Sequence, residues 1–156
     1  GLMKITVGLY LQSMMIRKYR IGNFTAEVKS QVYFEDAEPY SLFLFDGEQT
    51  DYSVTVEFSS DLPKKIENPY FVSHDRECDY ENGVLRCCYK SHDDENEYYA
   101  CRIADGKTIE IIIDEKYREM IRPDVVFSLI GIEELVAENN GCILHSSFIF
   151  FSAIIY

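Results

Sequence analysis

The chain has 156 residues, of which 47% are apolar and 27% charged, and this globular composition excludes general disorder and fits one ordinary domain. Its formal net charge of −12 repels phosphate backbones and anionic lipid, so it argues against a nucleic-acid binder or a membrane-surface binder. A soluble protein, or one with a basic protein partner, fits this charge better.

Alternating apolar residues predict several strands in the first half of the chain, and the heavy Tyr and Phe content supports β-structure. The clearest strand is 52–58, with Tyr52, Val54, Val56 and Phe58 on one face. A short apolar run at 40–46 ends at the turn-forming pair Asp46-Gly47. The other predicted strands are 4–11 and 18–28, the latter broken by a turn at Gly22-Asn23.

The second half predicts an antiparallel meander. Residues 61–69 hold two of the four prolines and form a predicted loop, followed by a short strand at 70–73. A hairpin of 84–90 and 97–103 surrounds the acidic loop Asp93-Asp94-Glu95-Asn96, and the turn Asp105-Gly106 leads to a strand at 108–113.

One helix is predicted from about 123 to 139, with Pro123 in its first turn and Asn139-Asn140-Gly141 as its C-cap. A short helical turn at 115–121 precedes it. Residues 142–156 carry no charged side chain, which predicts a buried strand that pairs within the chain or with a partner. We therefore expect an α+β fold: a predominantly antiparallel β-sheet with one main helix, in a single domain over 1–156.

No phosphate-binding loop is present in the sequence. Asp105-Gly106-Lys107-Thr108 contains Gly-Lys-Thr, but it lacks the first glycine of the phosphate-loop spacing and lies in a predicted hairpin. We interpret it as a turn.

A zinc site is one hypothesis for the histidines and cysteines. His74 with Cys78, and Cys142 with His145, form two closely spaced pairs that together would make a Cys2His2 site. A core role fits better, because residues three apart on a strand point to opposite faces and buried thiols are common in cores. The zinc hypothesis would make the chain a small hydrolase or a metal protein, which is one further hypothesis for its function.

Nucleophilic catalysis is disfavoured by the same geometry. His145 adjoins Ser146 and Ser147, but sequence neighbours on a strand point to opposite faces and cannot easily share a proton. The adjacent pair Cys87-Cys88 meets the same objection. The acidic cluster from His92 to Glu97 lacks the spacing of a calcium loop and is interpreted as solvated. Five cysteines without a signal peptide indicate free thiols and a cytoplasmic location.

The C-terminal segment Glu134–Tyr156 resembles a stretch of the HPr-kinase-like family, whose nucleotide-binding core is shared with phosphoenolpyruvate carboxykinase. The matching motif is a helix followed by Gly141-Cys142-Ile143-Leu144-His145-Ser146-Ser147 and then a second strand at 153–156. The resemblance implies structural roles for Gly141, Leu144, His145, Ser146 and Ser147. The upstream β-rich region, including Tyr19-Arg20-Ile21-Gly22, also looks like the N-terminal portion of such proteins.

Two departures limit what the resemblance carries over. The sequence ends at Tyr156, where the family's ATP loop should begin, so no ATP-binding or magnesium-binding residue is transferred. Phe151 also meets Ser152 directly, where relatives have a glycine-containing turn.

The expected function is therefore a non-catalytic N-terminal accessory or recognition domain of an HPr-serine-kinase-like ATP-binding protein, truncated before the phosphate-binding loop. Residues 1–122 would be the accessory region, and 123–156 the helix and two-strand start of the kinase-like core. No cofactor is expected in this chain, whereas ATP and magnesium are expected for a full-length parent. The alternative is a stand-alone β-rich protein-interaction module without enzymatic activity, in which a homodimer through the C-terminal strand is one arrangement.

Overall fold

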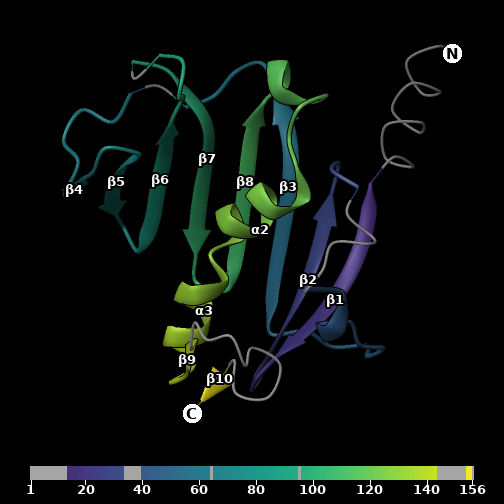
Figure 1. Cartoon of the computed structure of the whole chain (residues 1–156). Helices are drawn as coiled ribbons and strands as arrows, with labels where there is room; N and C mark the ends of the chain where they lie inside the picture. Colours follow the sequence, from purple (N-terminus) through teal and green to yellow (C-terminus); the bar gives the residue numbers. More distant parts are fainter. Residues whose placement is uncertain (1–13, 34–39, 64, 95, 144–153, 156) are drawn as a thin grey trace, which may run out of the picture.

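The fold is an eight-stranded mixed sheet with one bent helix on one face (Figure 1). The computed structural model describes residues 14–33, 40–63, 65–94, 96–143 and 154–155. The strand order is β1-β2-β3-β8-β7-β6-β5-β4. The strands are β1 (Met15–Ile21), β2 (Phe24–Ser30), β3 (Tyr52–Ser59), β4 (Phe71–Val72), β5 (Arg76–Glu81), β6 (Val84–Lys90), β7 (Tyr98–Asp105) and β8 (Thr108–Asp114). The predicted α+β class, sheet-rich and dominated by antiparallel pairing, is confirmed.

The predicted meander is present as β6, β7 and β8, which pair antiparallel in sequence order. The turn between β7 and β8 is centred on Gly106-Lys107, one residue later than predicted, and Gly106 has a φ of +57°. β5 was not predicted. It joins β6 through the two-residue turn Asn82-Gly83. Both residues have positive φ, as the type I′ turn of a β-hairpin requires.

Parallel pairing at the centre of the sheet is the feature that the alternation pattern did not predict. β3 lies parallel to β2 on one side and parallel to β8 on the other. Its apolar residues Tyr52, Val54, Val56 and Phe58 all face the helix side and are buried, as their alternation predicts.

The predicted helix is two segments, α2 (Pro123–Ile130) and α3 (Ile132–Glu138), which meet at Gly131. Gly131 has a φ of +75°, a left-handed conformation that glycine adopts at little cost. Past Glu138, the C-cap Asn139 is followed by Asn140 with a φ of +62°, and the Gly141 N–H donates to the Val136 carbonyl at 2.9 Å. The predicted C-cap is therefore confirmed, and the interior break is added to the prediction.

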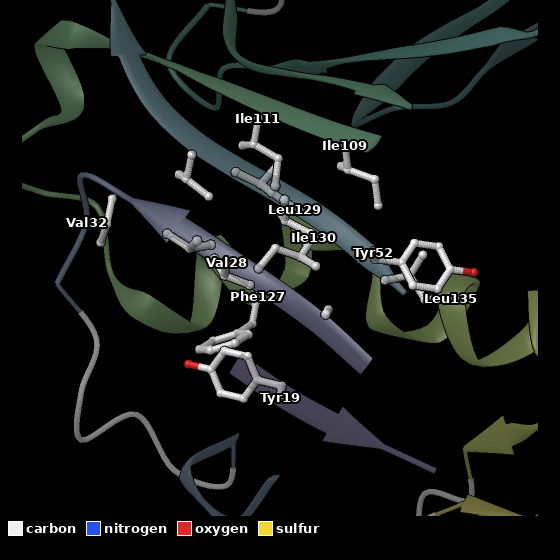
Figure 2. Close-up of a cluster of buried hydrophobic side chains, with 14 of the residues drawn as sticks. Tyr19, Val28, Val32, Tyr52, Ile109, Ile111, Phe127, Leu129, Ile130 and Leu135 are labelled. Atoms are coloured by element: carbon white, nitrogen blue, oxygen red, sulfur yellow. The ribbon is translucent and has the colours of Figure 1, made fainter. Parts of the chain in front are cut away.

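The main core lies between this bent helix and strands β1, β2, β3 and β8 (Figure 2). Phe127 packs edge-on against Tyr19 with ring centroids 5.6 Å apart and stacks on Tyr40 at 3.8 Å. Figure 2 shows Leu129 and Ile130 among side chains of the sheet, and both are fully buried. Burial of this apolar stripe holds the helix on the sheet.

The outer edge of β1 is partly covered. The 3-10 turn η1 (Tyr40–Phe43) leads to Leu44, which bridges Tyr19, and the Phe45 N–H donates to the Lys18 carbonyl at 3.1 Å. The predicted apolar run at 40–46 therefore folds as a short helical turn against β1, because its aromatic Tyr40 joins the core.

A second, smaller core lies on the face of the sheet opposite the helix. The predicted loop between β3 and β4 crosses this face and buries Ile66 against Cys88 and Cys101, with Leu62 and Tyr98 alongside. The loop thereby covers part of the surface of β6 and β7 that the helix cannot reach.

The remaining elements are short. The predicted helical turn is the 3-10 turn η2 (Glu115–Tyr117). β9 (Cys142–Ile143) and β10 (Ile154–Ile155) pair antiparallel. The predicted strand at 4–11 lies outside the described residues. Among the described residues, no helix combines the length and apolar character needed to cross a bilayer.

Candidate functional site

The residues of the zinc hypothesis fall on separate parts of the chain. His74 lies in the turn between β4 and β5, and Cys78 is a buried residue of β5. Cys142 begins β9, and His145 lies outside the described residues. Within the part of the chain that the structure describes, no three His, Cys, Asp or Glu side chains gather closely enough to hold a metal ion.

The family motif is visible only in part. Gly141 follows the helix and precedes β9, which pairs with β10. Leu144, His145, Ser146 and Ser147 lie outside the described residues, so their structural roles stay a prediction.

The Gly-Lys-Thr sequence is a hairpin turn, as predicted. Gly106 and Lys107 connect β7 to β8, and no helix begins there. The Lys107 ammonium lies 5.4 Å from the centroid of the Tyr52 ring, which accounts for its position without a phosphate.

The acidic loop between β6 and β7 makes local turn contacts and a surface ion pair. The Asp93 N–H donates to the Ser91 hydroxyl, and the Glu97 N–H donates to the Asp94 carbonyl. Glu97 accepts from the Lys116 ammonium at 2.9 Å, with both side chains about half exposed. This agrees with a solvated loop.

The β4 end of the sheet is the candidate site, because no helix of the described chain covers β4, β5 or β6 (Figure 1). Four large side chains there are between 43% and 67% exposed. We call them the edge patch: Tyr70, Phe71, Val72 and Tyr80. β4 pairs with β5 alone among the described strands, so its outer side is an open sheet edge.

Charged groups flank the edge patch. The Arg76 guanidinium lies 5.8 Å from the centroid of the Phe71 ring and 3.9 Å from a Glu134 carboxylate oxygen on α3. Partial desolvation of its phenol raises the pKa of Tyr70, and the nearby Cys78 and Cys87 thiols act in the same direction.

A polar hollow of about 410 Å³ opens beside the edge patch. It is lined by Lys65, Glu67, Asn68, Asp79, Tyr80, Glu81 and Arg86. The Arg86 guanidinium donates to Asp79 at 2.6 Å, and a buried Arg86 Nε has no hydrogen-bond partner. Three carboxylates against two cations give the hollow an acidic lining.

A half-buried polar network fixes the covering loop to the sheet. The Tyr98 hydroxyl donates to Glu77, whose other oxygen lies 3.6 Å from the Lys90 ammonium. The Ile66 N–H donates to the Tyr98 oxygen at 3.4 Å. Burial, and then the hydrogen bond to Glu77, raise the pKa of Tyr98. The network is a structural anchor, because each of its groups is paired.

The sequence reasoning missed the edge patch, because β5 itself was missed. Arg76–Glu81 alternates poorly in hydrophobicity, yet the Asn82-Gly83 pair after it is a strong hairpin indicator. That pair would have placed Tyr80 on a strand facing Leu85.

Scans against protein-family models, curated proteins and solved structures found no match to this chain.

Proposed function

We propose that this chain is a non-catalytic recognition domain that binds an extended peptide segment at the edge patch. The observation that carries the proposal is the exposure of Tyr70, Phe71, Val72 and Tyr80 together at an open sheet edge. Phe71 lies opposite Cys78, and Tyr80 is two residues further along β5, so these two rings share one face of the edge while Val72 lies on the other. Exposed apolar side chains at such a place mark interaction sites. The opposite edge, at β1, is partly covered by the segment around Leu44.

The composition of the patch supports a protein partner. Tyrosine and arginine are enriched among the residues that carry most of the energy in protein interfaces. Arg76 stands beside Phe71 and is only partly exposed, so its guanidinium is held against the aromatic surface. An extended segment would add main-chain hydrogen bonds along β4 and place alternate side chains on the patch.

The charge supports a basic segment. The chain carries a net charge of −12, and Glu67, Asp79 and Glu81 line the hollow beside the patch. A ligand with alternating apolar and basic residues would direct its apolar side chains to the aromatic rings and its basic ones to the hollow.

An HPr-kinase-like ATP-binding protein is the proposed setting for this domain. The support is the order of elements: the bent helix, then Gly141, then β9 paired with β10, which is the order of the family motif. The gene should encode Gly-x-x-x-x-Gly-Lys-Ser/Thr soon after Tyr156. A stop codon without that motif would contradict the kinase setting and leave the recognition proposal standing.

A stand-alone interaction module is the second candidate, and the pairing of Cys142–Ile143 with Ile154–Ile155 is compatible with it, because these described parts of the uncharged segment pair with each other. Sedimentation of the purified chain distinguishes the two. One defined species supports the stand-alone module, and polydisperse aggregates support a domain that requires its kinase core.

Peptide binding tests the recognition proposal directly. Labelled peptides that alternate valine with lysine, or valine with glutamate, are titrated with the protein and followed by fluorescence anisotropy. We expect the lysine peptide to bind and the double variant Tyr70→Ser/Tyr80→Ser to lose affinity about tenfold or more.

Tyr33→Ser is the matched control, since Tyr33 and Tyr80 are both 65% exposed. Affinity should be unchanged in this control, and added salt should weaken binding of the lysine peptide. Equal affinity for the two peptides, or an equal loss in the control, would overturn the proposal.

A further inference from the structure

We propose that Cys88 and Cys101 form a redox modification site, at which a small peroxide converts two thiols into a reversible disulfide between β6 and β7. The inference is independent of peptide recognition. Their sulfur atoms lie 3.0 Å apart, and both residues are fully buried.

Strand register places the two cysteines face to face. Cys88 of β6 is directly opposite Cys101 of β7 in an antiparallel pair. Opposed residues of this kind have Cα atoms about 4.5–5.5 Å apart, within the range that a disulfide spans. No strand has to move along its neighbour for the bond to form.

The hydrogen-bond alternation of the sheet places this pair at the closer of the two spacings. The Lys90 N–H donates to the Asp75 carbonyl, which makes Asp75 and Lys90 a hydrogen-bonded pair between β5 and β6. Two residues earlier along β6, Cys88 therefore also bonds toward β5, opposite Glu77. Its backbone groups point away from β7, so Cys88 and Cys101 form a non-hydrogen-bonded pair, with side chains at their closest.

The neighbouring thiols do not compete for this bond. Cys87 precedes Cys88 on the same strand and so points to the opposite face, where Cys78 lies across from it. Because their side chains point to opposite faces of β6, Cys87 and Cys88 face different partners. The structure assigns one partner to Cys88.

The chemistry balances with hydrogen peroxide as the oxidant. The Cys88 thiolate attacks one peroxide oxygen, the O–O bond breaks, and the hydroxide that leaves takes up a proton to become water. The Cys101 sulfur then attacks the Cys88 sulfenic acid, and the hydroxyl group leaves as water with the Cys101 proton. Two thiols are oxidised by two electrons, and one peroxide is reduced to two waters.

The local environment supports Cys88 as the attacking group. The hydrogen bond between the two thiols lowers the pKa of Cys88 and raises that of Cys101. Ile66 and Leu62 of the covering loop pack over the pair, which favours a small peroxide over a bulky disulfide as the oxidant.

Tryptic mass spectrometry tests the site, because trypsin cuts after Arg86, Lys90 and Arg102. It yields Cys87–Lys90 and Ser91–Arg102 as separate peptides. The folded chain, carrying Cys142→Ala to remove a further thiol, is treated with peroxide, blocked with iodoacetamide and digested. We expect the two peptides joined and lacking about 2 Da, the mass of two hydrogen atoms, with the link removed by dithiothreitol.

Adjacent variants identify the sulfur that bonds. Cys87→Ala should keep the link to Ser91–Arg102, and Cys88→Ala should abolish it, with circular dichroism confirming the fold of each. Fragmentation of the wild-type linked peptide between Cys87 and Cys88 gives the same assignment without a variant. Separate peptides after oxidation, links formed only between molecules, or loss of the link in Cys87→Ala would overturn the proposal.

Discussion

Replacement of Gly131 by alanine tests the bend between α2 and α3. Gly131 has a φ of +75°, which costs an alanine about 1–2 kcal/mol. An added Cβ would also lie 2.8 Å from a Glu134 carboxylate oxygen and 3.3 Å from an Arg102 guanidinium nitrogen. Glu134 is a flexible surface side chain that can swing away. Arg102 is 6% exposed and donates to the Ile130 carbonyl at 3.2 Å, so its side chain cannot move away from the added Cβ as easily.

We therefore expect Gly131→Ala to lower the free energy of unfolding by roughly 2–3 kcal/mol, adding about 1 kcal/mol of crowding to the backbone cost. Gly83→Ala is the matched control. Gly83 has a φ of +83° and nothing within 4 Å of an added Cβ, so its loss should be the backbone cost of about 1–2 kcal/mol alone.

Urea unfolding followed by circular dichroism measures both variants, and equal m-values show that the compared states are the same. For a chain of this size, each kcal/mol corresponds to about 2–4 °C in Tm. An equal loss in the two variants would refute the reasoning, because it would show that Arg102 does not restrict the space beside Gly131.

Two further predictions concern the core. Phe127→Ala should lower the free energy of unfolding by about 3–5 kcal/mol, because the ring is buried between Tyr19 and Tyr40. Leu42 is exposed, so Leu42→Ala should change the free energy of unfolding by less than about 0.5 kcal/mol in the same urea assay. Burial raises the pKa of Tyr19 and of Tyr89 to about 12. The unfolded phenols lose protons near pH 10, so stability is complete below about pH 10 and falls as the pH rises toward 12. Unfolding measured across this range checks the sign, and a flat profile would contradict it.

Local patterns located the elements whose sequence is periodic. The alternation in 52–58 predicts β3 and its buried face, because side chains on a strand alternate between the two faces. The helical spacing of apolar residues after Pro123 predicts the helix, because residues three and four apart lie on one helix face. Asn139-Asn140-Gly141 predicts its C-cap. β5 was not predicted from the sequence, because its residues are mostly polar or half exposed and show no clear alternation. The Asn82-Gly83 pair nevertheless indicated a hairpin.

The candidate site depended on tertiary structure. The edge patch exists because β4 ends the sheet and the helix packs on the other half, and neither fact is local in sequence. The zinc hypothesis and the family motif rest partly on residues outside those that the structure describes, so the structural roles that the resemblance implies for His145 and its neighbours stay a prediction.

The sequence by itself determined the α+β character, the meander, the helix and the acidic charge, because each follows from residue type and short-range spacing. Tertiary structure alone decided which strands distant in the sequence are neighbours. The parallel contacts of β3 with β2 and β8 join segments distant in the chain, and a shift of one residue in the register of β6 would turn Cys88 to the other face. The pairing of Cys88 with Cys101 is therefore a property of the folded sheet.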